Sequence, residues 1–416
     1  MSPSPLRVLI AGGGIGGLCL AQGLRKAGVD VTVFERAPSA AAFREGYRLH
    51  VSPEGSRALH SCLPDELFTV LQETSGRPPR SMSFLTERLA ELLSVEVLPA
   101  GAEPDPVAAH RSVNRYTLRQ ILLTGLDDIV HYGKECVGYE RHGDEAVTVR
   151  FADGSTAEGT VLIGAEGGRS AVREQLLPHA GRVETGMVSV GGRLPLDAET
   201  RALLPRHLSS GPASVLAPRG FSLFIATHQA VIADRYRHLA PPEAGDYVVW
   251  GFTGPRDRLP VVDRPAREVR RLVLERMRGW DRRLHALVER SDLDTIHPIV
   301  LRTAVPIDAW RPSNVTVMGD AIHSMPPSLG VGANIALRDA ELLTRKLSAV
   351  QRGRLGTVQA IGEYEREMRK YGFAAVRASN RALKQSAITG PVAFATTKAA
   401  LRIMNALPPV KNMVFR

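Results

Sequence analysis

The apolar positions of the first 35 residues predict a strand, a helix and a second strand. Residues Leu6–Ala11 form a continuous apolar run, as expected for a parallel strand that is covered on both faces. Glycines interrupt this run, a helical segment follows and closes at Gly28, and Val31–Phe34 form a second apolar run. The chain therefore begins with a strand–turn–helix–strand unit.

Two more apolar runs end in glycines later in the chain. Residues 147–151, the turn at Asp153-Gly154 and a further strand predict a hairpin that feeds Val161–Ala165 into the sheet, where Glu166-Gly167 follows. A third run, Val315–Met318, leads into Gly319-Asp320, a Pro-Pro loop, two more glycines and a long helix.

The middle of the chain has a different pattern. Its apolar runs either alternate with polar residues or end at Gly and Pro turns, which predicts a large antiparallel sheet. These runs are residues 187–196, 214–227, 230–237 and 246–254. After about residue 350 the periodicity becomes helical again, and the chain ends in a basic, apolar segment.

Composition narrows the class of protein. With 416 residues and 44% hydrophobic content, the chain is long enough for two domains or one elaborated domain. Cys19, Cys62 and Cys136 are widely spaced, which favours neither a disulfide framework nor a zinc site, and no metal is expected. Because removal of an N-terminal signal segment would delete the first glycine motif, and no apolar run reaches membrane-spanning length, we expect a cytoplasmic protein.

The net charge of +10 is concentrated near the C-terminus. Residues 366–416 contain ten Lys and Arg but only one acid, Glu367, a net charge of +9. No nucleic-acid-binding signature accompanies these charges, so no nucleic-acid partner is expected. A solvated basic face on C-terminal helices is the simpler interpretation, and peripheral contact with a membrane or another anionic partner is the alternative.

The first glycine cluster has the spacing of a dinucleotide site. Gly12 permits the tight turn, Gly14 lets the backbone approach a pyrophosphate, and Gly17 lets the helix pack on the strand. The helix N-terminus then faces the phosphates, and Glu35 at the end of the second strand can accept both ribose hydroxyls of an adenosine. An acid here disfavours the 2′-phosphate of NADP, which leaves NAD or FAD.

Three strand-to-glycine junctions exceed what one NAD requires and suit a longer ligand. With GxGxxG, a DG-like motif near the middle, and GD followed by His, Pro-Pro, GxG and Asn, the chain resembles the FAD-dependent aromatic hydroxylases, single-component flavoprotein monooxygenases similar to p-hydroxybenzoate hydroxylase. The resemblance covers roughly residues 6–350. It implies a mixed α/β (α+β) fold, in which a Rossmann-like FAD-binding domain carries an inserted β-sheet substrate domain and is followed by C-terminal helices.

The resemblance also implies domain limits and cofactor contacts. The FAD-binding domain would comprise residues 1–75, 105–180 and 306–350, the substrate domain residues 76–104 and 181–305, and the C-terminal helical segment residues 351–416. Arg115 would open a helix beside the ribityl and pyrophosphate groups, Asp320 would accept hydrogen bonds from the ribityl chain, and residues 330–334 would face the flavin pyrimidine. The full candidate set for FAD is Gly12, Gly14, Ile15, Gly16, Gly17, Glu35, Arg36, Arg115, Asp320, Gly330, Val331, Gly332, Ala333 and Asn334.

In the family it resembles, NADPH or NADH reduces the flavin, and a C4a-hydroperoxide formed with O2 transfers one oxygen atom to the substrate. The protein then has to bind FAD, exclude water and position an electron-rich carbon. The sequence identifies no catalytic residue. His323 could act as a base, but a structural role at its turn is the preferred interpretation. An aromatic or polyketide-like substrate of secondary metabolism is expected.

Two positions depart from the family pattern. Glu166 stands where the family has Asp, which keeps the charge and adds one methylene, and an arginine such as Arg115 or Arg173 is its expected partner. Val331 stands where many relatives carry a polar residue. Candidate substrate contacts are weaker, and core packing is the preferred interpretation for the aromatic ones; they are Arg193, Phe221, Phe224, Trp250, Phe252 and Pro326.

Two other functions remain open from the sequence. One is a different flavoenzyme on the same scaffold, a halogenase or a reductase, and the other is a non-catalytic partner that keeps FAD for structure. The three tryptophans, at positions 250, 280 and 310, are too far apart for the WxWxIP signature of the halogenases.

Overall fold

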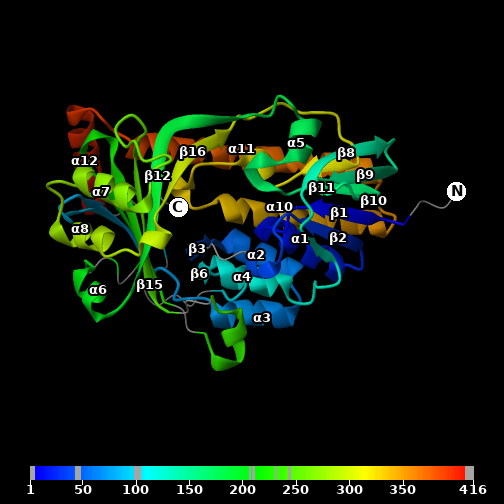
Figure 1. The fold of residues 1–416 in the computed structure, drawn as a ribbon, viewed down its shortest axis with the longest axis horizontal. Coiled ribbons are helices and arrows are strands. Elements are labelled where there is room, and N and C mark those ends of the chain that lie inside the picture. Colours follow the sequence, from blue (N-terminus) through cyan, green and yellow to red (C-terminus); the bar gives the residue numbers. More distant parts are fainter. Residues whose placement is uncertain are drawn as a thin grey trace.

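The computed structural model describes residues 5–42, 48–97, 105–205, 208, 211–229, 232–241 and 245–407. Two β-sheet regions lie at opposite ends of the long axis, and one long helix runs beside both (Figure 1). The mixed α/β fold that the sequence predicts is confirmed.

A five-stranded parallel sheet organises the first region. Its strands are β1 (Arg7–Ala11), β2 (Asp30–Glu35), β7 (Val130–Tyr132), β11 (Val161–Gly164) and β17 (Val315–Val317), in the order β17-β11-β1-β2-β7. Val8, Leu9 and Ile10 are fully buried, which explains the continuous apolar run of β1. The carboxyl ends of β1, β11 and β17 lead into the three glycine motifs, so the sheet brings all three motifs to one edge.

Helices α1 (Ile15–Lys26) and α10 (Gly332–Gln351) pack against each other beside this sheet. Their approach is close, because a Cβ on Gly16 would lie 3.2 Å from the Cβ of Ala336, and one on Gly23 would lie 2.4 Å from the Thr344 hydroxyl. The expected hairpin before β11 is confirmed as part of a small antiparallel sheet. This sheet consists of β8 (Cys136–His142), β9 (Ala146–Phe151) and β10 (Thr156–Gly159).

A seven-stranded sheet organises the second region. Its strands are β4 (Ser81–Thr86), β5 (Glu91–Glu96), β12 (Arg182–Pro195), β13 (Ala213–Leu216), β14 (Ser222–His228), β15 (Tyr247–Pro255) and β16 (His297–Ala304). The order is β16-β12-β15-β14-β13-β4-β5, and the only parallel pair is β13 with β4. Strands β4 and β5 come from a segment far earlier in the chain than the rest of the sheet.

One expected strand is wrong. Within residues 230–237, the described part forms a 3-10 helix, Asp234–Leu239, rather than a strand. Tyr236 packs against the core of the first region, and Arg235 forms an ion pair with Glu73 at 2.6 Å. The alternating pattern thus reflects contacts with the helices of the first region and not pairing in a sheet.

The two faces of the seven-stranded sheet have different neighbours. Helices α6 (Ala198–Leu203), α7 (Ala266–Arg276) and α8 (Arg282–Glu289) lie on one face (Figure 1). Val188, Val190, Leu223 and Ile225 point to these helices and share a core with Val273 and Leu284. The opposite face points toward the first region.

A two-stranded sheet lies between the two regions. Its strands are β3 (Arg48–Val51) and β6 (Arg111–Asn114), and the helices next to it are α2 (Pro53–Cys62), α3 (Asp65–Thr74) and α4 (Arg115–Leu123). Val51 and Val113 on one face of this small sheet belong to the core of the first region. The alternate residues, on the other face, are polar.

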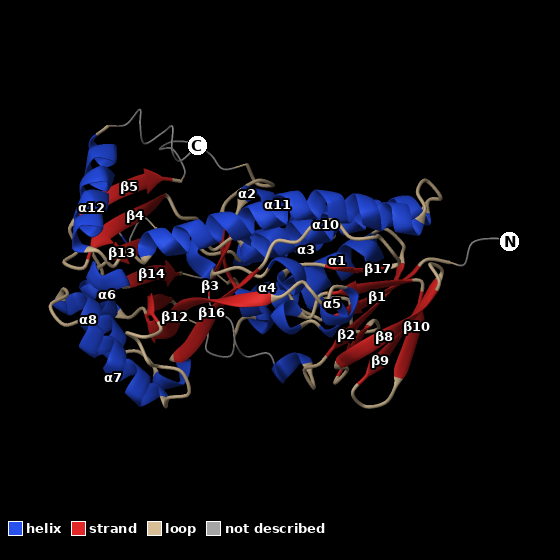
Figure 2. Cartoon of the chain, turned by 90° about the horizontal axis from the view of Figure 1, so that it is seen from above, coloured by secondary structure: helices blue, strands red, loops and turns tan. Residues whose placement is uncertain are grey.

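Helix α11 (Thr357–Ser386) connects both regions along the length of the molecule (Figure 2). The Tyr364 hydroxyl donates to the Val317 carbonyl at 3.0 Å in the first region, and the Asn380 amide donates to the Thr303 hydroxyl at 2.8 Å in the second. This helix therefore fixes the two regions relative to each other.

Helix α12 (Pro391–Ala406) packs against the edge strand β5. Phe394 is buried against Leu92 and Leu216, and the Asn405 side chain accepts a hydrogen bond from the Ser94 backbone N–H at 3.1 Å. The side of the expected basic tail that carries Phe394 is thus covered by the protein itself, whereas Val392 and Ile403 are exposed. Residues 408–416 of that tail lie outside the described residues.

Candidate cofactor and substrate site

The first glycine motif forms a turn with space for a ligand. Gly12 has a φ of +110°, and a Cβ there would lie 2.5 Å from the Ala165 carbonyl oxygen. A Cβ on Gly17 would lie 2.1 Å from the Gly12 carbonyl oxygen, whereas one on Gly14 would meet no atom within 4 Å. The first and third glycines are therefore required by packing, and the second leaves open space in front of the turn.

The N-terminus of α1 next to this turn is not neutralised by the protein. Gly14 is the N-cap residue, no side chain caps the helix, and no acid occurs in its first turn. The backbone N–H groups and the positive end of the helix are therefore available to an anion such as a pyrophosphate.

Glu35 ends β2 directly beside the turn. Its Oε2 accepts a hydrogen bond from the Gly13 N–H at 2.9 Å, and its Oε1 accepts one from the Ala37 N–H at 2.8 Å. The side chain is buried, but each carboxylate oxygen can accept two hydrogen bonds. Glu35 thus shapes the loop and keeps acceptor capacity for ribose hydroxyls. The neighbouring Arg36 is exposed.

Glu166 has other partners than the sequence suggests. Its Oε2 accepts a hydrogen bond from the Ser170 hydroxyl at 2.6 Å, and its Oε1 accepts one from the Val172 N–H at 3.1 Å. Arg173, expected as a partner, instead forms an ion pair with Glu174 at 2.7 Å. The expected direct contact with an arginine is wrong, because the longer side chain folds back to the start of α5 (Ala171–Leu176), but the nearby charge of Arg173 still favours the ionised form of Glu166. Burial raises the pKa of Glu166, although these hydrogen bonds oppose the shift.

The third motif places a second open helix N-terminus near the first. Asp320 begins the short helix α9 (Asp320–His323) and is exposed. Gly330 has a φ of +64°, and a Cβ on Gly332 would lie 3.9 Å from an Asp320 oxygen. Helix α10 has neither a side-chain cap nor an acid in its first turn. Asp320 and the positive end of α10 are therefore neighbours at one edge of the site.

Asn334 connects the start of α10 to strand β3. Its Oδ1 accepts a hydrogen bond from the Ser52 N–H at 2.8 Å, and its Nδ2 donates to the His50 carbonyl at 2.9 Å. A Cβ on Gly55 would lie 2.3 Å from Asn334 Oδ1, so α2 can approach only because this residue is glycine. Asn334 is buried and holds β3 against the first turn of α10, while Val331, Gly332 and Ala333 around it are partly exposed.

Two arginines on α4 differ in their surroundings. Arg115, singled out from the sequence, is the first residue of α4 and is exposed. Arg119, one turn later, is buried, and its Nε donates to the Gly13 carbonyl at 3.4 Å. Sequence reasoning missed Arg119, although its spacing of four residues from Arg115 places both on one side of the helix.

His323 lies away from any open surface. It is fully buried, and its Nε2 is 2.6 Å from Asp339 Oδ2, which also accepts the Gly319 N–H at 2.7 Å. Tyr371 donates to Asp339 Oδ1 at 2.6 Å. Burial opposes protonation of His323, but Asp339 outweighs it, and the pKa of the imidazole is raised. This arrangement supports the structural interpretation of His323.

The candidate substrate residues divide between the two faces of the seven-stranded sheet. Phe221, Trp250 and Phe252 are buried in the core under α7 and α8, where the Trp250 indole N–H donates to the Ser291 hydroxyl at 2.7 Å. Phe224, 38% exposed, and Arg193 lie on the opposite face. Pro326 is buried in the loop between α9 and α10.

The face that carries Phe224 also leaves space above two glycines, Gly191 and Gly251, which we call the open floor. Phe224 pairs across strands with Gly251, and Gly251 pairs with Gly191. A Cβ on either glycine would meet no atom closer than 3.9 Å. This row of cross-strand neighbours therefore places an aromatic ring, that of Phe224, beside the empty space over Gly251 and Gly191. A pocket for a planar ligand requires such an arrangement.

Sequence reasoning missed a set of polar residues between this face and the small sheet of β3 and β6. Because side chains alternate along a strand, Arg48, His50, Ser112 and Asn114 share one face of β3–β6. His228 of β14 and Tyr247 of β15 approach them from the larger sheet. We call the following set the polar layer: Arg48, His50, His110, Ser112, Asn114, His228 and Tyr247.

Hydrogen bonds connect the members of the polar layer. Ser112 Oγ lies 3.2 Å from His228 Nδ1 and accepts from Arg48 Nε at 2.9 Å. Asn114 Nδ2 donates to the Tyr247 hydroxyl at 3.1 Å. His110 Nδ1 lies 3.1 Å from His50 Nε2. The only sequence signal was the alternation of polar residues in two short strands, Arg-x-His and Ser-x-Asn.

The histidines of the polar layer are neutral at neutral pH. Burial, assisted by the Arg48 charge, lowers the pKa of both His50 and His228 to about 4. Burial also lowers the pKa of His110. The positive charge within the polar layer is therefore that of Arg48.

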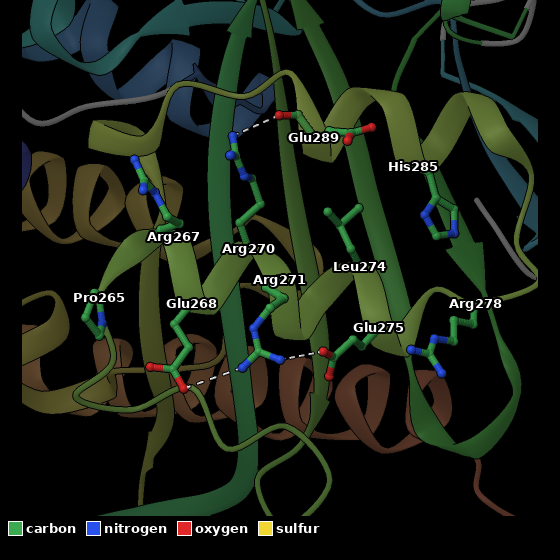
Figure 3. Close-up of a pocket in the computed structure, with 10 residues that line it drawn as sticks. All are labelled: Pro265, Arg267, Glu268, Arg270, Arg271, Leu274, Glu275, Arg278, His285 and Glu289. Carbon is green, nitrogen blue, oxygen red and sulfur yellow. Dashed lines mark hydrogen bonds and ion pairs between the residues drawn. The ribbon is translucent and has the colours of Figure 1, made fainter.

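A separate hollow of about 860 Å³ lies between α7 and α8, on the other side of the seven-stranded sheet (Figure 3). Arg271 in its wall is paired with Glu275 at 2.6 Å, and Arg270 donates to the Glu289 carbonyl at 2.8 Å. Its charged groups are thus largely satisfied by each other, and none of the three glycine motifs borders it. It does not belong to the candidate site.

Two features are absent from the described residues: a membrane-spanning helix and a metal centre. No helix there is both long and apolar enough to cross a membrane. No group of three or more His, Cys, Asp or Glu side chains in that part of the chain is arranged to hold a metal ion.

Comparisons with known proteins agree with this geometry. The profile of an NAD(P)-binding Rossmann-like domain matches residues 10–69, and that of an FAD binding domain matches residues 281–379. A solved structure described as an FAD-containing monooxygenase of Photorhabdus luminescens superposes with a TM-score of 0.82 at 36% identity, covering 92% of this chain and 98% of the other.

Curated relatives carry related names. The chain is 32% identical over 390 residues to the dual O-methyltransferase/FAD-dependent monooxygenase CTB3 of Cercospora beticola, covering 87% of this chain and 44% of that protein. It is 32% identical over 349 residues to the aurachin C monooxygenase/isomerase of Stigmatella aurantiaca, covering 82% and 81%. The chain therefore spans less than half of the first relative and most of the second.

Proposed function

Because this chain belongs to the FAD-dependent monooxygenase family, we propose that it uses NADH or NADPH and O2 to oxygenate an aromatic or polyketide-like small molecule. The observation that carries the proposal is the pair of open helix N-termini, α1 and α10, which lack acids and side-chain caps and lie at the same edge of the parallel sheet. Two such positive ends suit a cofactor that carries both a pyrophosphate and a ring system that becomes negative on reduction.

The residues at this edge fit FAD. The space in front of Gly14 and the start of α1 would accept the pyrophosphate, and Glu35 would accept the adenosine ribose hydroxyls. Arg115 and Asp320 would contact the pyrophosphate and ribityl parts, and residues 330–334 would lie at the flavin pyrimidine. Gly16 and Asn334 serve this site through packing and positioning, since their neighbours are protein atoms.

FAD, when bound, supplies the redox chemistry: it takes up hydride from the nicotinamide nucleotide and lets O2 donate one oxygen atom to the substrate. The chain itself contributes position and environment. Helix α10 directs its positive end at the site, which favours the negative charge of a reduced ring system. The face of β14 and β15 opposite α7 and α8 would hold the substrate against the cofactor and exclude water.

Substrate-dependent oxygen consumption tests this function. FAD-loaded protein is mixed with NADPH or NADH and a panel of phenols, quinones and polycyclic aromatic compounds. We expect at least one compound to stimulate both nucleotide oxidation and O2 uptake and to gain 16 mass units. Nucleotide oxidation without an oxygenated product would instead indicate a reductase, and no stimulation by any compound would contradict the proposed substrate class.

Substitution of Asp320 tests the cofactor site separately. Asp320→Ala removes a charged acceptor next to α10, and a charged hydrogen bond contributes on the order of 1.5–3 kcal/mol, so we expect FAD affinity to fall roughly 10- to 150-fold. The thermal unfolding of the apoprotein should change little, because Asp320 is exposed. Equal FAD titrations for the variant and the wild type would contradict the placement of this motif.

The remaining partners are predictions of the same kind. We also propose a cytoplasmic location and a contact between the basic C-terminal segment and an anionic surface. The exposed Val392 and Ile403, with Lys398 and Arg402 on the same helix, support such a contact, whereas the buried Phe394 limits it.

A further inference from the structure

We propose that Arg48 binds the negative charge of the substrate in the polar layer, so that the enzyme selects aromatic compounds that are carboxylates or phenolates. This inference rests on the proposed function, and it deepens that function by naming the charge of the substrate. Three observations carry it: the position of Arg48, its lack of a counter-ion, and incomplete hydrogen bonding around it.

The position follows from strand β3. Asn334, on the first turn of α10, binds the His50 carbonyl at 2.9 Å. Arg48 precedes His50 by two residues on the same strand, so its side chain emerges from the same face about 7 Å away. Arg48 therefore lies between the open end of α10 and the substrate-facing side of the seven-stranded sheet.

The charge of Arg48 is not neutralised by the protein. Its Nε donates to the neutral Ser112 hydroxyl at 2.9 Å, and within the described residues no carboxylate forms an ion pair with it. Burial lowers the pKa of this guanidinium, which still remains charged at neutral pH. A partly buried cation without a counter-ion is costly, and an anionic ligand is what would offset that cost.

The hydrogen bonds around Arg48 are also incomplete. Nε2 of His228, a residue only 1% exposed, has no partner within the part of the chain that the structure describes. Buried polar atoms normally have partners, so an unsatisfied one next to Ser112 and Arg48 indicates that the polar layer is completed by something else. The open floor at Gly191 and Gly251 lies on the same sheet face as His228 and Tyr247 and leaves space for a ring.

The polar layer lies between two apolar cores. The core of the first region lies behind β3 and β6, and the core under α7 and α8 lies behind β14 and β15. Between them, the facing side chains of β3 and β6 are polar, and β14 and β15 contribute His228 and Tyr247 next to the buried Ala226 and Val249. A contact that served only to join two regions would be more stable if it were apolar, which favours a ligand-binding role for these residues.

The test compares charged and neutral ligands of the same shape. FAD-loaded protein is titrated with 4-hydroxybenzoate and 4-hydroxybenzamide, salicylate and salicylamide, 1-hydroxy-2-naphthoate and its amide, and 4-nitrophenolate and 4-nitroanisole. Binding is followed by the change in the visible flavin spectrum. We expect at least one anion to bind about tenfold or more tightly than its neutral counterpart, and the carboxylate and phenolate pairs show which anion is preferred.

Variants of Arg48 then show whether this residue causes the preference for anionic over neutral ligands. Arg48→Gln should reduce the anion-to-neutral ratio to about one, while Arg48→Lys should retain part of it. Arg345→Gln is the matched control, because Arg345 lies on α10 with its side chain 65% exposed, and it should keep the wild-type ratio. FAD affinity is measured for each variant and should stay within a few-fold of the wild type.

Two results would overturn the assignment: no preference for any anion in the wild type, or an unchanged ratio in Arg48→Gln, whether or not FAD affinity falls. Turnover separates this inference from the proposed function. Oxygenation of neutral compounds without anion preference would refute the role of Arg48 and leave the function intact. An Arg48-dependent preference without any oxygenation would support Arg48 and refute the function.

Discussion

The two faces of the seven-stranded sheet are built from alternate residues of the same strands, yet they differ in chemistry. On the face under α7 and α8, Phe252 is fully buried and stacks on Phe221 at 5.4 Å. On the opposite face, Tyr247 and His228 form hydrogen bonds with residues of another sheet, and Phe224 remains 38% exposed. One face is closed by packing along its length, and the other is open only around Phe224.

The difference shows how one strand can serve stability and function at once. Period-two alternation separates the two sets of side chains, so the closed face can be optimised for packing while the open face carries polar groups such as His228, whose Nε2 has no partner among the described residues. Burying such groups is expensive, and the core under α7 and α8 provides the stability that allows it.

The largest effect is expected on the closed face. Phe252→Ala removes a fully buried ring that contacts both Phe221 and Trp280, and such truncations cost about 3–5 kcal/mol. We expect urea unfolding to show this loss, while the FAD affinity of the folded protein stays within about twofold. Weakened FAD binding at temperatures where the variant is folded would show that the two faces are not independent.

A smaller effect, which depends on pH, is expected on the open face. His228 in the folded protein has a pKa of about 4, below its ordinary value of 6.5, because burial and the Arg48 charge disfavour the proton. The unfolded chain therefore binds a proton at pH values where the folded protein does not. The stabilisation is complete above pH 6.5 and is lost as the pH falls toward 4, by roughly 2–3 kcal/mol.

The variant His228→Gln should show this directly, since glutamine does not titrate but can still bond to Ser112. Between pH 7 and pH 4.5 its free energy of unfolding should fall by less than that of the wild type. His50 has a similarly lowered pKa and keeps part of the acid dependence in both proteins. If the wild type and the variant lost the same stability over this range, His228 would have to be protonated in the folded state.

The elements that depend on local sequence or on core packing were easier to predict from the sequence than the polar layer. The apolar run of β1, the glycine spacing and Glu35 lie within about 30 residues, and local periodicity and turn chemistry are enough to recognise them. The hairpin at Asp153-Gly154 was found in the same way. For Trp250 and Phe252, core packing was the preferred interpretation, and their positions agree with it.

The polar layer was not predictable in this way. Its residues come from β3, β6, β14 and β15 and, for His110, from the position just before β6, and each strand contributes only one or two of them. The alternation in β15 shows that Tyr247 and Trp250 point to opposite faces, but which face becomes the site depends on where the first region packs. That packing is set by contacts such as Asn334 with His50, nearly 300 residues apart in the chain. The same lack of tertiary information explains the wrong strand at residues 230–237 and the wrong partner of Glu166.

The smallest change in stability is expected for Phe224→Ala. Phe224 projects from β14 beside the open floor of Gly251, and its partial exposure means that truncation should alter the free energy of unfolding by less than about 1 kcal/mol. Aromatic pairs contribute about 0.5–1.5 kcal/mol beyond area burial, so affinity for an aromatic ligand should fall two- to tenfold. The matched control is Phe221→Ala, which truncates a ring on the closed face: it should destabilise the protein by several kcal/mol and leave ligand affinity unchanged. Flavin spectral titration with 1-hydroxy-2-naphthoate, together with urea unfolding, measures both quantities in both variants. If Phe221→Ala weakened the ligand as much as Phe224→Ala did, the face assigned to the substrate would be wrong.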